Sequence, residues 1–107
     1  MEELKSVQDW DKFQGKATEQ TVLVFKHSTQ CPISAEAFEE FQAFTSENPT
    51  FETAYVKVIE SRPVSNQIAE DLNTTHKSPQ LFVLKNGQVH WTESHWNIKN
   101  KAIAEQV

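Results

Sequence analysis

The chain of 107 residues has little of several residue types, and each shortage argues against a class of protein. Only two residues are glycine, which argues against the Gly-rich loops that hold phosphate groups and against low-complexity sequence. Lys and Arg number ten against fifteen Asp and Glu, whereas nucleic-acid binding needs a basic surface. No apolar run approaches the roughly 18 residues of a membrane-spanning helix. We therefore expect a globular protein with neither a nucleic-acid nor a membrane partner.

Cysteine occurs once, at Cys31, so the chain cannot form an internal disulfide. A lone cysteine fits the reducing cytoplasm, and the start at Met1 lacks the basic and apolar segments of a secretory signal. We therefore expect a cytoplasmic protein. The four histidines include no pair at metal-ligand spacing, and with one cysteine a zinc site is not expected; they are His27, His76, His90 and His95.

The apolar pattern predicts one α/β domain over residues 1–107. Strands are predicted at 21–25, 51–59, 81–84 and 88–92, the last two joined by a hairpin turn at Asn86-Gly87. Helices are predicted at 6–15, 32–48, 62–73 and 97–107, with Ser6 and Asn97 as N-terminal caps. The order of elements indicates a four-stranded mixed sheet with helices on both faces.

Cys31 lies between a predicted strand and a predicted helix, where a thiol becomes reactive. It ends a polar loop and precedes Pro32, and proline is favoured as the first residue of a helix. The first amide groups of a helix have no internal partners, and together with the helix dipole they stabilise a thiolate, which is the nucleophilic form. We therefore expect a reactive Cys31 rather than a buried structural cysteine.

Three further positions near the cysteine are candidates for the same site. Ser34 shares a face of the first helical turn with Cys31, where its hydroxyl can bond a thiolate but cannot resolve a mixed disulfide. An ordinary first-turn serine is an equally good interpretation. Pro79 follows Ser78 at a predicted strand start, a position that proline tolerates, and the bond before a proline is the only common site of a cis peptide, although a turn proline fits too. His27 could favour the thiolate if it lies nearby, but a polar strand end is the simpler interpretation.

These sites and the order of elements resemble the thioredoxin superfamily along the whole chain. In that superfamily a C-x-x-C or C-x-x-S motif opens the helix after the first core strand, and a cis-proline faces it. More narrowly, three segments resemble the monothiol bacilliredoxins of the bacilliredoxin C type: Thr29-Gln30-Cys31-Pro32-Ile33-Ser34, Ser78-Pro79-Gln80 and Ser94-His95-Trp96.

The resemblance implies a monothiol thiol–disulfide oxidoreductase with a thioredoxin-like fold. Cys31 would remove bacillithiol, a low-molecular-weight thiol of many Gram-positive bacteria, from mixed disulfides with client proteins. It implies bacillithiol as a co-substrate, no tightly bound cofactor, and bacillithiolated proteins as partners. The implied catalytic residues are Cys31, Pro32 and Ser34, and the implied substrate-binding residues are Thr29, Gln30, Ser78, Pro79, Ser94, His95 and Trp96.

Departures from related families narrow this interpretation. Phe25 stands six residues before Cys31, where thioredoxins carry a buried acid, and the Gly-Gly segment with which glutaredoxins hold glutathione is missing.

Trp96 is either a platform for the small thiol or a core aromatic. Lys26 and Lys77 either supply positive potential or are ordinary surface lysines. The alternatives to an oxidoreductase are a non-catalytic module that docks a protein through the aromatic surface near Trp91 and Trp96, and an iron–sulfur carrier.

Overall fold

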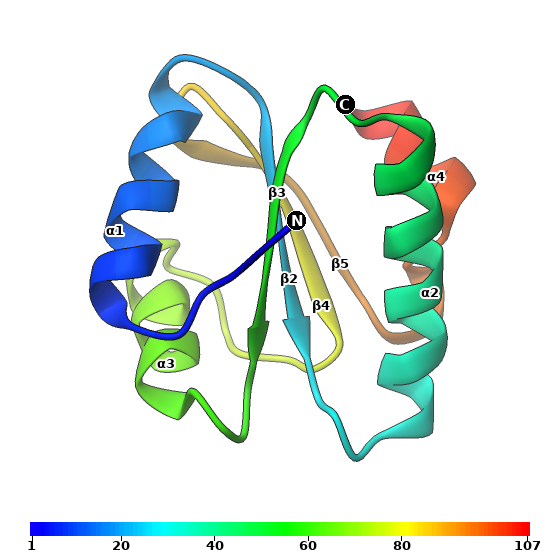
Figure 1. Cartoon of the computed structure of the whole chain (residues 1–107), viewed down its shortest axis with the longest axis horizontal. Coiled ribbons are helices and arrows are strands. Elements are labelled where there is room, and N and C mark those ends of the chain that lie inside the picture. Colours follow the sequence, from blue (N-terminus) through cyan, green and yellow to red (C-terminus); the bar gives the residue numbers. More distant parts are fainter.

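Five strands form the central sheet in the computed structural model, which describes residues 1–107 (Figure 1). Their order across the sheet is β1-β3-β2-β4-β5. The central strand β2 (Val22–His27) runs parallel to β3 (Glu52–Lys57) and antiparallel to β4 (Gln80–Lys85), and β5 (Gln88–Ser94) pairs antiparallel with β4. Strands β2 and β4 are buried on both faces, as their continuous apolar runs predict. The predicted mixed sheet is confirmed.

The sheet has one strand more than predicted, because β1 (Glu2–Glu3) adds to its edge. Its two residues are both acidic and give no apolar signal. The strand forms through backbone pairing with β3, and the Leu4 N–H then donates to the Tyr55 carbonyl at 2.9 Å. Leu4 itself is fully buried, so its burial helps to hold this short edge strand in place.

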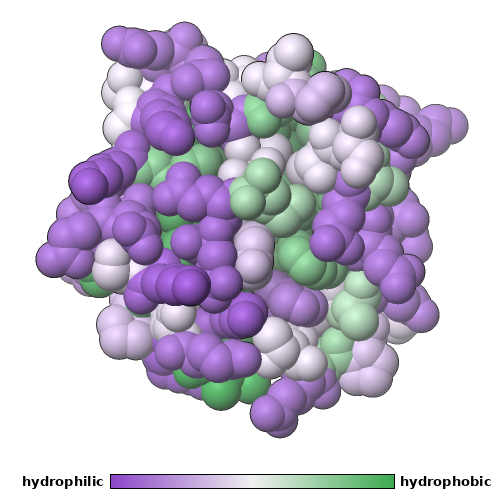
Figure 2. Space-filling model, in the orientation of Figure 1, coloured by the Kyte–Doolittle hydropathy of each residue, from purple (hydrophilic) through white to green (hydrophobic).

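Helices cover both faces of the sheet, as predicted (Figure 1). On one face lie α1 (Val7–Gly15), the short helix η1 (Lys16–Thr18) and α3 (Arg62–Asp71). On the other lie α2 (Pro32–Glu47) and α4 (Asn100–Gln106). Residues of β2 alternate between two cores, with Val22 and Val24 facing the first layer and Leu23 and Phe25 the second. Hydrophilic side chains cover most of the surface in Figure 2, where apolar ones show mainly along the middle.

Two local signals in the sequence correctly predicted element boundaries. Ser6 caps α1, because its Oγ accepts the Asp9 N–H at 3.1 Å. Asn86 and Gly87 form the hairpin turn with φ angles of 54° and 75°, the left-handed conformation that a two-residue turn between antiparallel strands requires. These contacts lie within a few residues of one another, so the local sequence specifies them.

The predicted cap of the last helix is wrong. Asn97 lies in a separate short helix, η2 (His95–Asn97), and α4 starts only after Lys99. The Asn100 N–H at the start of α4 donates to the Glu40 carboxylate of α2 at 2.7 Å. A side chain sixty residues away thus supplies the partner that a local cap would have given. No helix of the structure is both long and apolar enough to cross a membrane.

Candidate active site

Cys31 is the N-cap residue of α2, at the end of the loop that leaves β2. Its backbone is extended, with φ −114° and ψ 120°, and Pro32 is the first helical residue. The Cys31 N–H donates to the Ser28 carbonyl at 3.2 Å, and the Cys31 carbonyl accepts the Ala35 N–H at 3.0 Å. The first turn holds no acidic residue, and Cys31 is only partly buried. The thiol therefore lies within reach of a partner at the positive end of a helix of 16 residues.

Ser34 is fully buried and closes the loop between β2 and α2. Its Oγ accepts the Ser28 N–H at 2.9 Å and lies 2.8 Å from Nδ1 of His27. Ser34 is therefore not a solvated first-turn serine, since its hydroxyl joins the strand end to the helix. None of the side-chain hydrogen bonds involves Sγ of Cys31, so contact between this hydroxyl and a thiolate stays a prediction.

His27 is the last residue of β2, as the simpler interpretation of this residue predicts, and its ring packs against α2. Its ring stacks on Phe38 of α2, with centroids 4.4 Å apart and planes 18° apart. Burial lowers the pKa of His27 below its usual 6.5; the Glu60 carboxylate opposes this shift, and Lys57 reinforces it. The ring is therefore mainly neutral at pH 7. His27 and Ser34 are seven residues apart, and a loop separates the strand of one from the helix of the other. Neither the strand period nor the helix period relates two such positions, so the sequence pattern could not predict their contact.

Phe25 occupies the position at which thioredoxins carry a buried acid. It is fully buried, stacks on Phe41 with centroids 5.4 Å apart, and contacts Phe38 at 5.3 Å between centroids. The space beneath the first turns of α2 is thus filled by aromatic rings. Proton transfer from a carboxylate at this position is excluded.

The Ser78-Pro79 turn meets the segment that follows β5 at the same end of the sheet. The Ser78-Pro79 bond is cis, and the Pro79 carbonyl accepts the His95 N–H at 3.2 Å. Gln80 pairs with Ser94 on one side and with Lys26 on the other, next to the loop that carries Cys31. The structure therefore brings the three predicted segments to one end of the sheet.

Four substrate-binding candidates are exposed there: Thr29, Gln30, His95 and Trp96. Trp96 is 56% exposed, so it is not the core aromatic of the alternative interpretation. Thr29 and Gln30 are exposed in the loop before Cys31, and the Thr29 hydroxyl donates to the Glu60 carboxylate at 3.0 Å. This bond holds Thr29 toward the segment after β3.

A buried polar cluster fixes the chain before the Ser78-Pro79 turn. Lys26 is fully buried, so the surface interpretation of this residue is wrong, whereas Lys77 is exposed. Nζ of Lys26 lies 3.1 Å from Nδ1 of His76, and burial lowers the pKa of Lys26 to about 8. The Gln80 amide donates to the Thr75 carbonyl and accepts the Lys77 N–H, both at 3.2 Å. Residues 75–77 are thus tied to β2 and β4.

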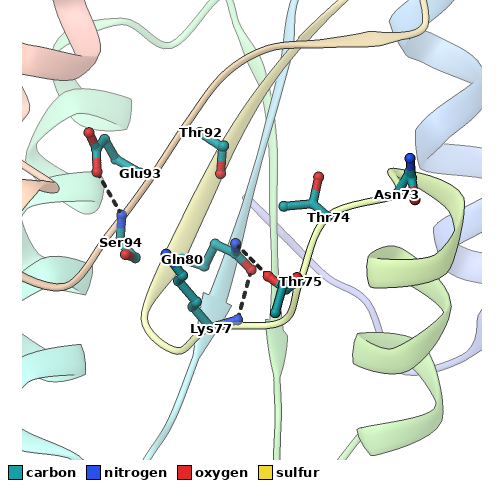
Figure 3. A pocket seen from close by; sticks show the side chains of 8 residues that line it. All are labelled: Asn73, Thr74, Thr75, Lys77, Gln80, Thr92, Glu93 and Ser94. Atoms are coloured by element: carbon teal, nitrogen blue, oxygen red, sulfur yellow. Dashed lines mark hydrogen bonds between the residues drawn. The ribbon is translucent and has the colours of Figure 1, made fainter.

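A cavity of about 340 Å³ opens beside the same turn (Figure 3). It carries no hydrophobic side chain and is lined by Asn73, Thr74, Thr75, Lys77, Gln80, Thr92, Glu93 and Ser94. Of these residues the sequence interpretation had singled out only Ser94 as a substrate-binding residue. The cavity forms between three separate segments, so local patterns could not reveal it.

Comparison with known proteins identifies the family. The family described as Monothiol bacilliredoxin BrxC matches residues 2–103. A solved structure of a candidate oxidoreductase with a thioredoxin fold is 32% identical, with a TM-score of 0.89 over 98% of this chain and 91% of that one. Oxidized thioredoxin O2 from Arabidopsis thaliana is 20% identical, with a TM-score of 0.81 over 99% and 92% of the two chains. Fasciola hepatica thioredoxin is 18% identical, with a TM-score of 0.77 over 98% and 94%.

The two thioredoxins show the fold alone, and they confirm the predicted thioredoxin-like architecture. The family match extends over almost the whole chain and includes the Cys31-Pro32-Ile33-Ser34 motif. The chain belongs to the monothiol bacilliredoxins, and it is accordingly a thiol–disulfide oxidoreductase of bacillithiol chemistry.

Proposed function

We propose that Cys31 is the nucleophile that removes bacillithiol from mixed disulfides of client proteins. The Cys31 thiolate attacks the bacillithiol sulfur of the client disulfide. A disulfide forms between Cys31 and bacillithiol, and the client cysteine leaves as a thiolate that takes up a proton from water. One disulfide replaces another, so no external oxidant or reductant is needed in this step.

The position of Cys31 at the N-cap of α2 carries this proposal. With Pro32 as the first helical residue, the free amide groups of the first turn and the helix dipole favour an anion at this point. No acidic side chain of the first turn opposes it, and the partial exposure of the thiol leaves room for an incoming disulfide. Cys31 is only partly buried, so the apolar surroundings that would disfavour a thiolate do not enclose it.

The product disulfide requires a thiol from outside the chain. Ser34 stands where a dithiol oxidoreductase has its resolving cysteine, and a hydroxyl cannot attack a disulfide under these conditions. A second bacillithiol thiolate attacks the bacillithiol sulfur of the mixed disulfide, which yields bacillithiol disulfide and free Cys31. A reducing protein partner is the alternative source of this thiol.

The substrate-binding surface in this proposal surrounds the Ser78-Pro79 turn. The peptide before Pro79 aligns the incoming disulfide, and residues 94–96 bind the small thiol, for which the exposed ring of Trp96 is suited. The hydrogen bond from His95 to the Pro79 carbonyl supports this grouping because it joins the two segments directly. Thr29 and Gln30 border the same thiol from the loop before it.

Mass spectrometry tests the proposal. Purified protein is mixed with bacillithiol disulfide, and separately with a model protein that carries one bacillithiol mixed disulfide. We expect one adduct on Cys31 in the first experiment and release of the client thiol in the second, with slower reaction of glutathione disulfide. Cys31→Ser is the matched control and loses both reactions while it keeps the fold. Absence of the adduct, or client release by Cys31→Ser, would defeat the proposal.

A further inference from the structure

We propose that His27 is a positioning residue that orients the Ser34 hydroxyl toward the Cys31 thiolate. The inference rests on the proposed function only in taking Cys31 as the reacting thiolate. It concerns a histidine that lies outside the cysteine motif and that acts through a second side chain.

The hydrogen-bonding capacity of the Ser34 hydroxyl sets the geometry. A serine hydroxyl has one proton to donate and two lone pairs that accept. The Ser28 N–H occupies one lone pair at 2.9 Å, and Nδ1 of His27 lies 2.8 Å from the same oxygen. Because Ser34 is fully buried, water does not supply the remaining partner. The state of Nδ1 therefore decides where the hydroxyl proton points.

Two arrangements satisfy these distances. If Nδ1 carries no proton, it accepts the hydroxyl proton of Ser34, which then points away from Cys31. If Nδ1 carries the proton, His27 donates to Oγ, both lone pairs are filled, and the hydroxyl proton is left for another acceptor. Cys31 is the N-cap residue and Ser34 the third helical residue, so their side chains are neighbours in the first turn. No hydrogen bond joins the two side chains in the structure; in the proposed arrangement the thiolate of Cys31 becomes that acceptor when the thiol ionises.

Ionisation of Cys31 therefore selects the second arrangement. The chain of bonds then runs from Nδ1–H of His27 to Oγ of Ser34, and from the Ser34 hydroxyl to Sγ of Cys31. The total number of protons on His27 does not change, because its proton is only redistributed between the two ring nitrogens. A hydrogen bond to a charged group is among the stronger ones, so this chain stabilises the thiolate over the thiol.

The surroundings of the ring allow this role. Stacking on Phe38 fixes the ring plane, and the packed rings of Phe25 and Phe38 carry no charge. The charged groups that act on His27 are Glu60 and Lys57, which have opposite effects, while burial keeps the ring mainly neutral at pH 7. The choice at His27 is therefore between two neutral tautomers rather than between a charged and a neutral ring.

The pH profile of Cys31 alkylation by iodoacetamide tests the coupling in a double-mutant cycle. His27→Phe keeps an aromatic ring against Phe38 but removes both nitrogens, and Ser34→Ala removes the hydroxyl. We expect Ser34→Ala to raise the profile midpoint by about one pH unit, a tenfold loss of thiolate at lower pH, because it removes the donor itself. We expect His27→Phe to raise the midpoint by less, because the hydroxyl then loses only the partner that orients it. The double variant should shift no further than Ser34→Ala. Shifts that add, or a wild-type midpoint in His27→Phe, would overturn the inference.

His27→Asn provides a test by rescue, because its side-chain amide places an N–H donor close to the position of Nδ1. We expect this variant to restore most of the wild-type midpoint in the Ser34 background and none of it in the Ser34→Ala background. A purely structural ring would make His27→Phe the better substitute, and that ranking would contradict the proposal. Iodoacetamide needs no bacillithiol site, so failure of this coupling is distinguishable from failure of the bacillithiol reaction.

Nitrogen NMR of the imidazole gives a readout that packing alone would not move. As Cys31 ionises, we expect the His27 nitrogen shifts of the wild type to move toward the Nδ1–H tautomer. In Cys31→Ala the same pH range should leave the tautomer ratio unchanged. Equal behaviour of the two proteins would refute the hydrogen-bond chain.

Discussion

Lys26 offers a quantitative test of how the structure distributes charge. The side chain is fully buried, and its ammonium group has His76 as its hydrogen-bond partner at 3.1 Å. Burial lowers the pKa of Lys26 from 10.5 to about 8, so the lysine is still mainly charged at pH 7. A buried charge without an opposite charge costs free energy of folding. We predict that Lys26→Met, which keeps most of the length of the side chain and removes its charge, stabilises the protein at pH 7.

The magnitude follows from the change in pKa. The step from 10.5 to about 8 corresponds to about 3 kcal/mol of unfavourable free energy at pH 7. His76 is exposed, so solvent screens part of this cost, and the bond to His76 is lost in the variant. We therefore expect a gain of about 2 kcal/mol, with each kcal/mol raising the thermal midpoint by about 4–8 °C in a domain of this size.

The sign of the pH dependence distinguishes this explanation from better packing. Because the folded pKa of Lys26 lies below the unfolded value, the unfolded chain binds more protons between pH 8 and 10.5. The wild type should therefore gain stability over this range, and the advantage of Lys26→Met should shrink toward zero. Urea denaturation at pH 7, 8.5 and 10 measures the free energy of unfolding of each protein. The contributions of the other titrating groups cancel in the difference between the two proteins.

Two outcomes would refute this reasoning about Lys26. One is a Lys26→Met protein that is less stable than the wild type at pH 7, which would mean that the ammonium group contributes net stabilisation through His76. The other is an advantage that stays constant between pH 7 and 10. Lys101→Met is the matched control at an exposed position of α4, and it should change stability by no more than about 0.5 kcal/mol at any of these pH values.

Two smaller predictions concern bonds that hold element ends in place. Ser6→Ala removes the cap of α1 and should cost about 1 kcal/mol in urea denaturation, whereas Ser46→Ala on the exposed side of α2 should cost much less. Gln80→Leu leaves the Lys77 N–H and the Thr75 carbonyl without their partner and should cost about 1–2 kcal/mol; a cost near zero would show that water replaces these bonds freely.

Much of the fold was predictable because its signals are local. Continuous apolar runs identify β2 and β4, whose two faces are both covered, and Ser6 and Asn86-Gly87 specify a helix start and a turn through contacts within four residues. The position of Cys31 before Pro32 likewise depends only on the local sequence. These features follow from chain stereochemistry and from burial, and a single sequence records both.

Features that depend on distant partners could not be predicted. Strand β1 exists through its pairing with β3, and α4 starts where Glu40 of another helix receives its first amide. The contact between His27 and Ser34 joins a strand end to a helix across a loop. The burial of Lys26 was hidden for a related reason. Its charge indicates a surface residue, but the alternation of side chains along β2 places position 26 in the interior.

The aromatic rings beneath α2 limit which polar side chains can act on the thiol of Cys31. Thioredoxins place a carboxylate and a second cysteine near the nucleophile, whereas Phe25 and Ser34 stand at those two positions here. The apolar ring of Phe25 cannot hold or move a proton, and Ser34 cannot take over the disulfide. The Ser34 hydroxyl and the His27 ring are two polar groups that lie together beside the first turn. In the proposed mechanism the second thiol comes from outside the chain, and this pair is the route by which side chains tune the thiolate of Cys31.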